Sequence, residues 1–205
     1  MKRDLVIIIR NRNYLLLVIV YAMVFGVYSC LGAIINNLAS AYGFTSVDAS
    51  IFGAAFIISG LIGSFIISSF LDKYKAYIKA LRIVCFGSFF FGFLQRITFG
   101  LGPEFFPLVV INIGCVGMFI IPIIPVCYAF SVELTYPVSE AMSNGCMMLI
   151  SQLLSVIGTV IATKLTDDNP NNCMYMFLLM ITLGCVSSLF IKEDLRRINI
   201  EKDTN

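Results

Sequence analysis

The feature that most constrains this chain is a series of six long apolar blocks. Each block is near or above the ~20 residues that an α-helix needs to cross a hydrocarbon core about 30 Å thick. Soluble helices carry an apolar stripe and are not apolar all round, so a soluble bundle fits poorly. We therefore predict an all-α membrane protein with six transmembrane helices, at residues 14–41, 48–71, 80–99, 105–131, 138–163 and 173–191.

Composition agrees with this class and argues against several others. Only 13% of the 205 residues are charged, whereas soluble domains carry about 25%. The chain has no histidine, so it cannot form a Ser–His or Cys–His nucleophile pair, and a zinc site is not expected. Arg10 and Arg12 interrupt the first apolar run, which is not typical of a signal peptide. We expect a protein that is not an enzyme and needs no cofactor or metal.

The distribution of basic residues predicts the orientation in the bilayer. Of the 14 Lys and Arg residues, only Arg96 and Lys164 fall on one side of the predicted spans. The positive-inside rule then places both termini in the cytoplasm, as parts of a multi-pass integral membrane protein. The expected division is a cytoplasmic segment 1–13, a six-helix bundle 14–191 and a cytoplasmic tail 192–205. Basic residues at membrane ends need no nucleic-acid partner. The residues on the basic side are Lys2, Arg3, Arg10, Arg12, Lys73, Lys75, Lys79, Arg82, Lys192, Arg196, Arg197 and Lys202.

An acidic stretch, residues 130–140, lies on the same predicted side as the basic segment 71–82. In one interpretation Pro137 and Glu140 occupy the first turn of the fifth span, where proline and a carboxylate suit a helix N-terminus. Glu133 is then a solvated end of the fourth span. In the other interpretation the acids pair with the basic segment when the cytoplasmic side closes. The members of this gating charge network are Asp72, Lys73, Arg82, Glu133 and Glu140.

Two sets of motifs resemble known transporters. The arrangement Gly63, Asp72-Lys73, Lys79 and Arg82 resembles the loop pattern that follows the second helix of a major facilitator half. The runs "VELTYPVSEAMSNG" and "IKEDLRRINI", with Ser151-Gln152, resemble the carboxyl-terminal half of the feline leukaemia virus subgroup C receptor family. The resemblance implies one half of a major facilitator fold, built from two inverted repeats of three helices. It also implies transport of choline and ethanolamine, or of haem, to which the family was earlier linked.

Aromatic and uncharged polar residues in two spans supply candidate substrate contacts. A quaternary ammonium is recognised by aromatic faces, and polar side chains at mid-membrane depth usually face the bundle interior. The resemblance places a substrate-contacting glutamine at Gln152 and, aligned on Gly26, a cage tyrosine at Ser29. Tyr28 precedes Ser29 by one residue, which is about 100° of helix rotation. The candidates are Gln152, Tyr28, Ser29, Asn36, Tyr21 and Met148.

Other roles stay open for these residues. Small and polar residues on membrane helices also serve helix packing, and Tyr21 would equally suit an interfacial aromatic belt. Pro122 and Pro125 predict a kink in the fourth span.

The predicted function is part of a facilitative carrier for choline-like organic cations. No Asp, Glu, Lys, Arg or His lies deep in a predicted span, so we expect downhill transport without a proton relay. The resemblance implies that a second half supplies a tryptophan to the cage, and this chain has no tryptophan. The partners expected are therefore the cation, the bilayer and a second six-helix half. That half is a missing amino-terminal segment, a separate chain or a second copy. The alternatives are a non-transporting or degenerate membrane subunit and a haem transporter.

Overall fold

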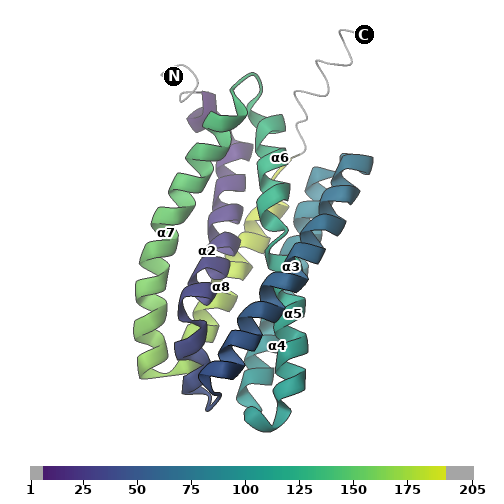
Figure 1. Cartoon of the computed structure of the whole chain (residues 1–205). Helices are drawn as coiled ribbons and strands as arrows, with labels where there is room; N and C mark the ends of the chain where they lie inside the picture. Colours follow the sequence, from purple (N-terminus) through teal and green to yellow (C-terminus); the bar gives the residue numbers. More distant parts are fainter. Residues whose placement is uncertain (1–6, 193–205) are drawn as a thin grey trace.

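The computed structural model describes residues 7–192 as a bundle of helices (Figure 1). Six helical segments are long and apolar enough to cross a membrane, which confirms the predicted all-α six-span class. The predicted basic residues 2, 3, 196, 197 and 202, and most of the "IKEDLRRINI" motif, lie outside the described residues. The elements are α2 (Arg12–Ala41), α3 (Ser46–Tyr74), α4 (Tyr77–Gly100), the 3₁₀ turn η1 (Pro103–Phe105), α5 (Phe106–Ile120), α6 (Ile123–Thr135), α7 (Glu140–Asp168) and α8 (Pro170–Leu189).

Side-chain caps mark where α2, α3 and α8 begin, the last through Asn169. The Asn11 side chain accepts a hydrogen bond from the Tyr14 amide at the start of α2. Its amide nitrogen also donates to the Leu134 carbonyl at 2.7 Å, which joins α2 to the end of α6. Thr45 and Asp48 form a reciprocal capping box at the start of α3. These short polar residues therefore satisfy amide groups that a helix end leaves unpaired.

The fourth span bends where the two prolines predict it. α5 ends at Ile120 and α6 begins at Ile123. Pro122 has no N–H group to donate to the Met118 carbonyl, and Pro125 has none for the Ile121 carbonyl. The Ile124 amide donates to the Ile121 carbonyl at 3.2 Å instead, a tighter turn than the α-helix makes. The span is therefore two helices, α5 and α6, with the break near its middle.

The helices pack crosswise, as an inverted repeat requires. α2 packs most extensively on α7 and α8, whereas α5 packs most extensively on α3 and α4. α4 and α8 also pack on each other. If α5–α6, α7 and α8 correspond to α2, α3 and α4, the contacts of α2 with α7 and α8 map onto those of α5 with α3 and α4, and the α4–α8 contact maps onto itself. The fold is thus one half of a major facilitator fold, in which two groups of three helices interlock.

Two layers follow from this packing. In Figure 1, α7, α2, α6 and α3 face the viewer, and α4 and α8 lie behind them. We call the layer of α7, α2, α6 and α3 the front face. Arg12, Lys75 and Lys192 lie at the end where the described chain begins and finishes, which we call the basic end.

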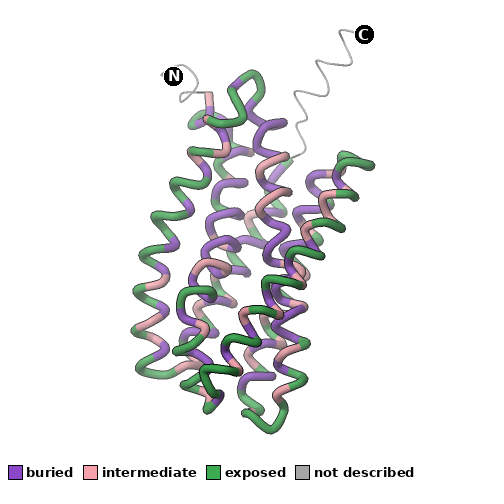
Figure 2. The backbone as a smooth tube through the Cα atoms, viewed as in Figure 1, coloured by how far each residue is buried: buried purple, intermediate pink, exposed green. Residues whose placement is uncertain are grey.

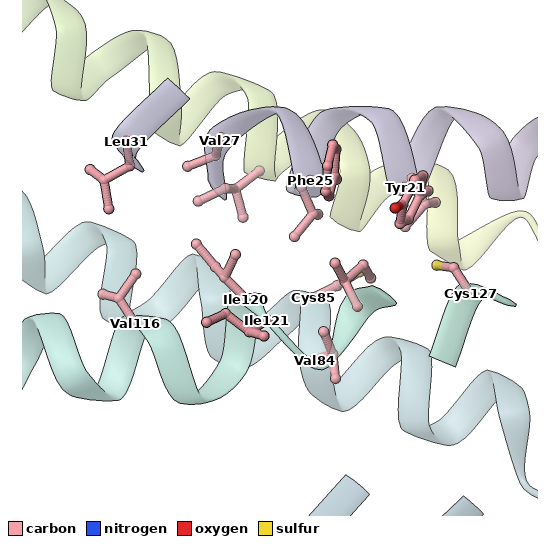
Figure 3. Close-up of a cluster of buried hydrophobic side chains, with 14 of the residues drawn as sticks. Tyr21, Phe25, Val27, Leu31, Val84, Cys85, Val116, Ile120, Ile121 and Cys127 are labelled. Atoms are coloured by element: carbon pink, nitrogen blue, oxygen red, sulfur yellow. The ribbon is translucent and has the colours of Figure 1, made fainter. Parts of the chain in front are cut away.

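α2 is the central helix of the bundle. In its most apolar stretch 61% of the residues are buried, against 22% of those in the matching stretches of α3 and α7; Figure 2 shows the burial along the chain. The side chains of α2 face apolar residues of α4, α5 and α6 in the core (Figure 3). The labelled residues of this cluster are Tyr21, Phe25, Val27, Leu31, Val84, Cys85, Val116, Ile120, Ile121 and Cys127.

Glycines allow α3 and α5 to approach almost backbone to backbone. A Cβ built on Gly63 of α3 would lie 2.2 Å from the Met118 carbonyl oxygen. A Cβ built on Gly117 of α5 would lie 2.2 Å from the Phe56 carbonyl oxygen. Small residues serve close helix packing in membranes, where lipid supplies no hydrophobic drive for association. This contact fixes the position of Phe56 relative to the bend in span four.

Candidate functional site

A series of aromatic rings runs along α2 from the middle of the front face toward the basic end. Tyr28 stacks on Phe56 of α3, with ring centroids 5.9 Å apart and planes at 17°. On its other side Tyr28 contacts Phe25 at 5.6 Å, and Phe25 stacks on Tyr21 at 5.0 Å. Tyr21 in turn contacts Tyr128 of α6 at 5.7 Å. We call these five residues the aromatic ladder.

A cavity of about 290 Å³ lies between α2 and α3 at the Tyr28–Phe56 end of the ladder, and we call it the central pocket. Its lining includes two aromatic rings, one serine hydroxyl and two glycines, and no charged residue. Tyr28 and Ser29 both line it although they are successive residues of one helix. The resemblance places the cage tyrosine at Ser29, one residue after Tyr28, and both residues line the same cavity. The lining includes Tyr28 and Ser29 of α2 and Gly53 and Phe56 of α3.

Tyr21 and Met148 meet at Tyr128 and lie outside the central pocket. Tyr21 is fully buried, so the interpretation as an interfacial belt residue is wrong. Its hydroxyl lies 3.4 Å from that of Tyr128, which donates a hydrogen bond to the Met148 sulfur at 2.9 Å. The structure thus links α2, α6 and α7 through one phenol group.

Gln152 and Asn36 are exposed and are not among the residues lining the central pocket. Gln152 lies one helical turn from Met148, on the flank of α7 that approaches α6. The other flank of α7 carries exposed aliphatic residues such as Leu149 and Leu153. Asn36 lies two turns beyond Tyr28 on α2, toward the end opposite the basic end. The sequence candidates therefore form one compact pair, Tyr28 and Ser29, with the other residues at a distance from it.

A second cavity, of about 330 Å³, lies near the basic end, and we call it the acidic pocket. Glu133 of α6 and Glu140 of α7 both line it, as do Tyr77, Tyr128 and Asn144. Glu133 is only 6% exposed, so its interpretation as a solvated helix end is wrong. Its burial comes from neighbouring helices that the local sequence does not reveal.

The acidic stretch also differs from the sequence prediction at its proline. Glu140 lies in the first turn of α7, as predicted. Pro137, however, lies in the loop before the N-cap residue Ser139, so its placement in the first turn is wrong. A carboxylate at Glu140 complements the positive end of the helix dipole without help from a proline.

The remaining members of the predicted charge network lie at the ends of α3 and α4. Asp72 and Lys73 are exposed in the last turn of α3. The Lys73 ammonium lies 5.4 Å from the centre of the Tyr74 ring. Arg82 is half-buried on α4, and its Nε atom has no hydrogen-bond partner among the described residues. The acidic and basic parts of the network thus all lie toward the basic end.

Sequence reasoning missed three aromatic members of these cavities: Phe56, Tyr77 and Tyr128. Phe56 is one of 18 phenylalanines, nearly all in apolar runs, and nothing in the sequence distinguishes it. Tyr128, in the run "PVCYAF", carries a signal, because it is a polar aromatic residue within a predicted span. Among residues 7–192, no group of three or more His, Cys, Asp or Glu side chains is arranged so that it could hold a metal ion.

Comparison with known proteins identifies relatives along nearly the whole chain. No family model matches. The human choline/ethanolamine transporter FLVCR2 is 31% identical over 197 residues, which cover 95% of this chain and 37% of that protein. The choline/ethanolamine transporter FLVCR1 of Felis catus is 30% identical over 97% of this chain and 36% of its own length. Solute carrier family 49 member A3 of Danio rerio is 24% identical over 96% of this chain and 44% of its own length.

Two of these relatives are named as choline/ethanolamine transporters and the third as a solute carrier, and the chain spans well under half of the length of each. The likeness runs without a large gap through all six spans, and the crosswise packing is that of a single facilitator half. Over nearly its whole length the chain is therefore homologous to part of the proteins of the feline leukaemia virus subgroup C receptor family.

Proposed function

We propose that this chain is one half of a carrier that moves choline-like organic cations across a membrane. The observation that carries the proposal is the central pocket, with its aromatic walls and no charged lining residue. A trimethylammonium group cannot donate a strong hydrogen bond, and it is held instead by the electron-rich faces of aromatic rings. The two relatives named as choline/ethanolamine transporters support this class of cargo.

The front face is where we place the second half. The substrate site of such carriers lies near the bilayer midplane, at the interface between repeated units. Here the central pocket opens between α2 and α3, and α7 exposes Gln152 beside α6. We propose that an amino-terminal half, a separate chain or a second copy covers this face. Gln152 and Asn36 then reach the cargo from the walls of the shared cavity.

The basic end is the cytoplasmic end in this proposal. The positive-inside rule places Arg12, Lys75 and Lys192 there, with segments 1–13 and 192–205 flanking the bundle. In this proposal the cytoplasmic side closes when Glu133 of α6 or Glu140 of α7 pairs with the basic segment 71–82, at the end of α3 and the start of α4.

Transport is downhill and independent of protons in this proposal. Within the described helices every charged residue lies within about two turns of a helix end. Proton-coupled carriers place titratable residues inside the membrane. Counterflow of labelled choline in proteoliposomes is therefore expected to persist when the pH gradient is dissipated. Counterflow that collapses with the gradient contradicts the uncoupled mechanism.

The test of function is uptake of labelled choline by the expressed chain, alone and together with an amino-terminal half. Tyr28→Leu removes a ring worth about 0.5–2 kcal/mol to a bound cation, which is about 2- to 30-fold in affinity. Tyr28→Phe keeps the ring and serves as the matched control. Gln152→Ala is expected to lower uptake at an unchanged surface level. Absence of uptake under both conditions refutes the carrier and favours a non-transporting membrane subunit.

A further inference from the structure

We propose that the acidic pocket is a second cation station, separate from the central pocket. It holds an organic ammonium ion between the membrane centre and the water at the basic end. The inference rests on the proposed function for the class of cargo, but it concerns a different cavity with a different chemistry.

Two carboxylates from different helices face this cavity. Glu133 lies two residues before the end of α6, and Glu140 lies in the first turn of α7. The Glu133 side chain is 6% exposed, so little water screens the charge that it presents to the pocket. A carboxylate in such a place attracts a cation more strongly than one on an open surface. The central pocket offers no such group.

Aromatic rings accompany the carboxylates. Tyr77 of α4 lines the acidic pocket, and its ring stacks on Phe130 at 5.7 Å with the planes 10° apart. Tyr128 of α6 lines it too, next to Ala129. Aromatic faces together with a negative charge suit an organic ammonium better than a metal ion, because the rings bind the methyl-covered cation. The cavity of about 330 Å³ is somewhat larger than the central pocket of about 290 Å³.

The aromatic ladder joins the two cavities at Tyr128. Phe56 and Tyr28 line the central pocket, and Tyr128 lines the acidic one. Between them, Tyr21 is 0% and Phe25 is 5% exposed. The middle of the ladder is therefore closed within this half, and the cation has two separate resting places. A cation that leaves the neutral central pocket is drawn toward the carboxylates at the basic end.

Protection of an engineered thiol tests the second station directly. Ala129 is half-buried and lines the acidic pocket, so Ala129→Cys adds a small reporter. The rate of maleimide labelling is measured on the purified full chain in nanodiscs, after subtracting the rate without the added cysteine. We expect saturating choline or tetramethylammonium to slow labelling at least threefold. The neutral isostere 3,3-dimethylbutan-1-ol is expected to give no protection, because it has the shape of choline without the charge.

Variants separate this station from the central pocket. Glu133→Gln and Glu140→Gln are each expected to abolish the protection. Glu104→Gln, an exposed acid at the opposite end, is expected to leave it unchanged. Tyr28→Leu, which disables the central pocket, is also expected to leave the protection intact. Protection of the Ala129→Cys thiol can therefore be observed even if the chain does not transport choline.

Three results overturn the inference. Protection that survives both glutamine variants shows that the carboxylates do not hold the cation. Protection that disappears with Tyr28→Leu assigns the cation to the central pocket alone. No protection by either cation shows that the acidic pocket takes none. If Glu133→Gln does not fold, Glu140→Gln and Tyr77→Leu, compared with Tyr77→Phe, give the same decision.

Discussion

The close approach of α3 and α5 gives the sharpest prediction about stability. Gly63→Ala places a Cβ 2.2 Å from the Met118 carbonyl oxygen, and 2.9 and 3.0 Å from the Met118 carbonyl carbon and Cα. All three atoms belong to the backbone, so no flexible side chain can move aside. Restoring ordinary contact requires the two helices to separate by on the order of 1 Å. Such overpacking typically costs about 1–3 kcal/mol.

Gly53→Ala is the matched control because Gly53 lies on the same helix and a Cβ there meets nothing within 4 Å. Both substitutions gain the same helix propensity, about 0.5–1 kcal/mol. The difference between the two variants is therefore the clash alone, about 1–3 kcal/mol. For a chain of this size each kcal/mol moves the melting temperature by about 2–4 °C, so we expect a gap of about 2–12 °C.

A thiol-reactive dye provides the assay, because five of the seven free cysteines are buried and react only on unfolding. The purified variants are heated in detergent with the dye, and the midpoints are compared. Gly117→Ala is expected to behave like Gly63→Ala, since its Cβ would lie 2.2 Å from the Phe56 carbonyl oxygen. Equal midpoints for Gly63→Ala and Gly53→Ala would refute the reasoning.

Three further predictions follow from single contacts. Asn11→Ala is expected to lose the α2 cap and the bond to the Leu134 carbonyl, about 1–3 kcal/mol together; Asn11→Ser keeps the cap and should recover part of this in the same dye assay. Tyr14→Phe removes a 2.7 Å bond to the Ser143 carbonyl and should lower stability by about 0.5–1.5 kcal/mol, and no change in midpoint would contradict that. Phe56→Leu removes the ring that stacks on Tyr28 and should weaken choline binding about 2- to 10-fold in equilibrium dialysis. Phe65→Leu on the same helix, 77% exposed, is its control, and equal losses would contradict a specific role for Phe56.

The number of spans and their positions could be predicted because lipid imposes length and apolarity on each helix. α7 begins at Glu140 where a start at residue 138 was predicted, and α4 begins at Tyr77 where residue 80 was predicted. The bend in span four was also predictable, since proline lacks the amide that a helix needs. These features depend on local chemistry, which the sequence shows directly.

The candidate site was predicted only in part. Tyr28 and Ser29 were candidates, and both line the central pocket. Phe56 was not a candidate, because its position at the central pocket depends on the glycine contact between α3 and α5. The position of Glu133 near the end of its span is compatible with a solvated helix end. Its burial arises where α6 meets residues of α4 and α7, and no periodicity in the α6 sequence reports those neighbours.

The crosswise packing also governs how the chain assembles during synthesis. α2 leaves the ribosome before its principal partner α7, which comes only after three other spans. The bond from Tyr14 to Ser143 joins residues 129 positions apart. α2 must therefore wait in the bilayer, with Asn11 lacking the Leu134 carbonyl until α6 is inserted and Tyr14 lacking the Ser143 carbonyl until α7 is inserted. A ribosome that stalls in the middle of this chain leaves a product with its central helix uncovered, which the quality-control machinery of the membrane can recognise.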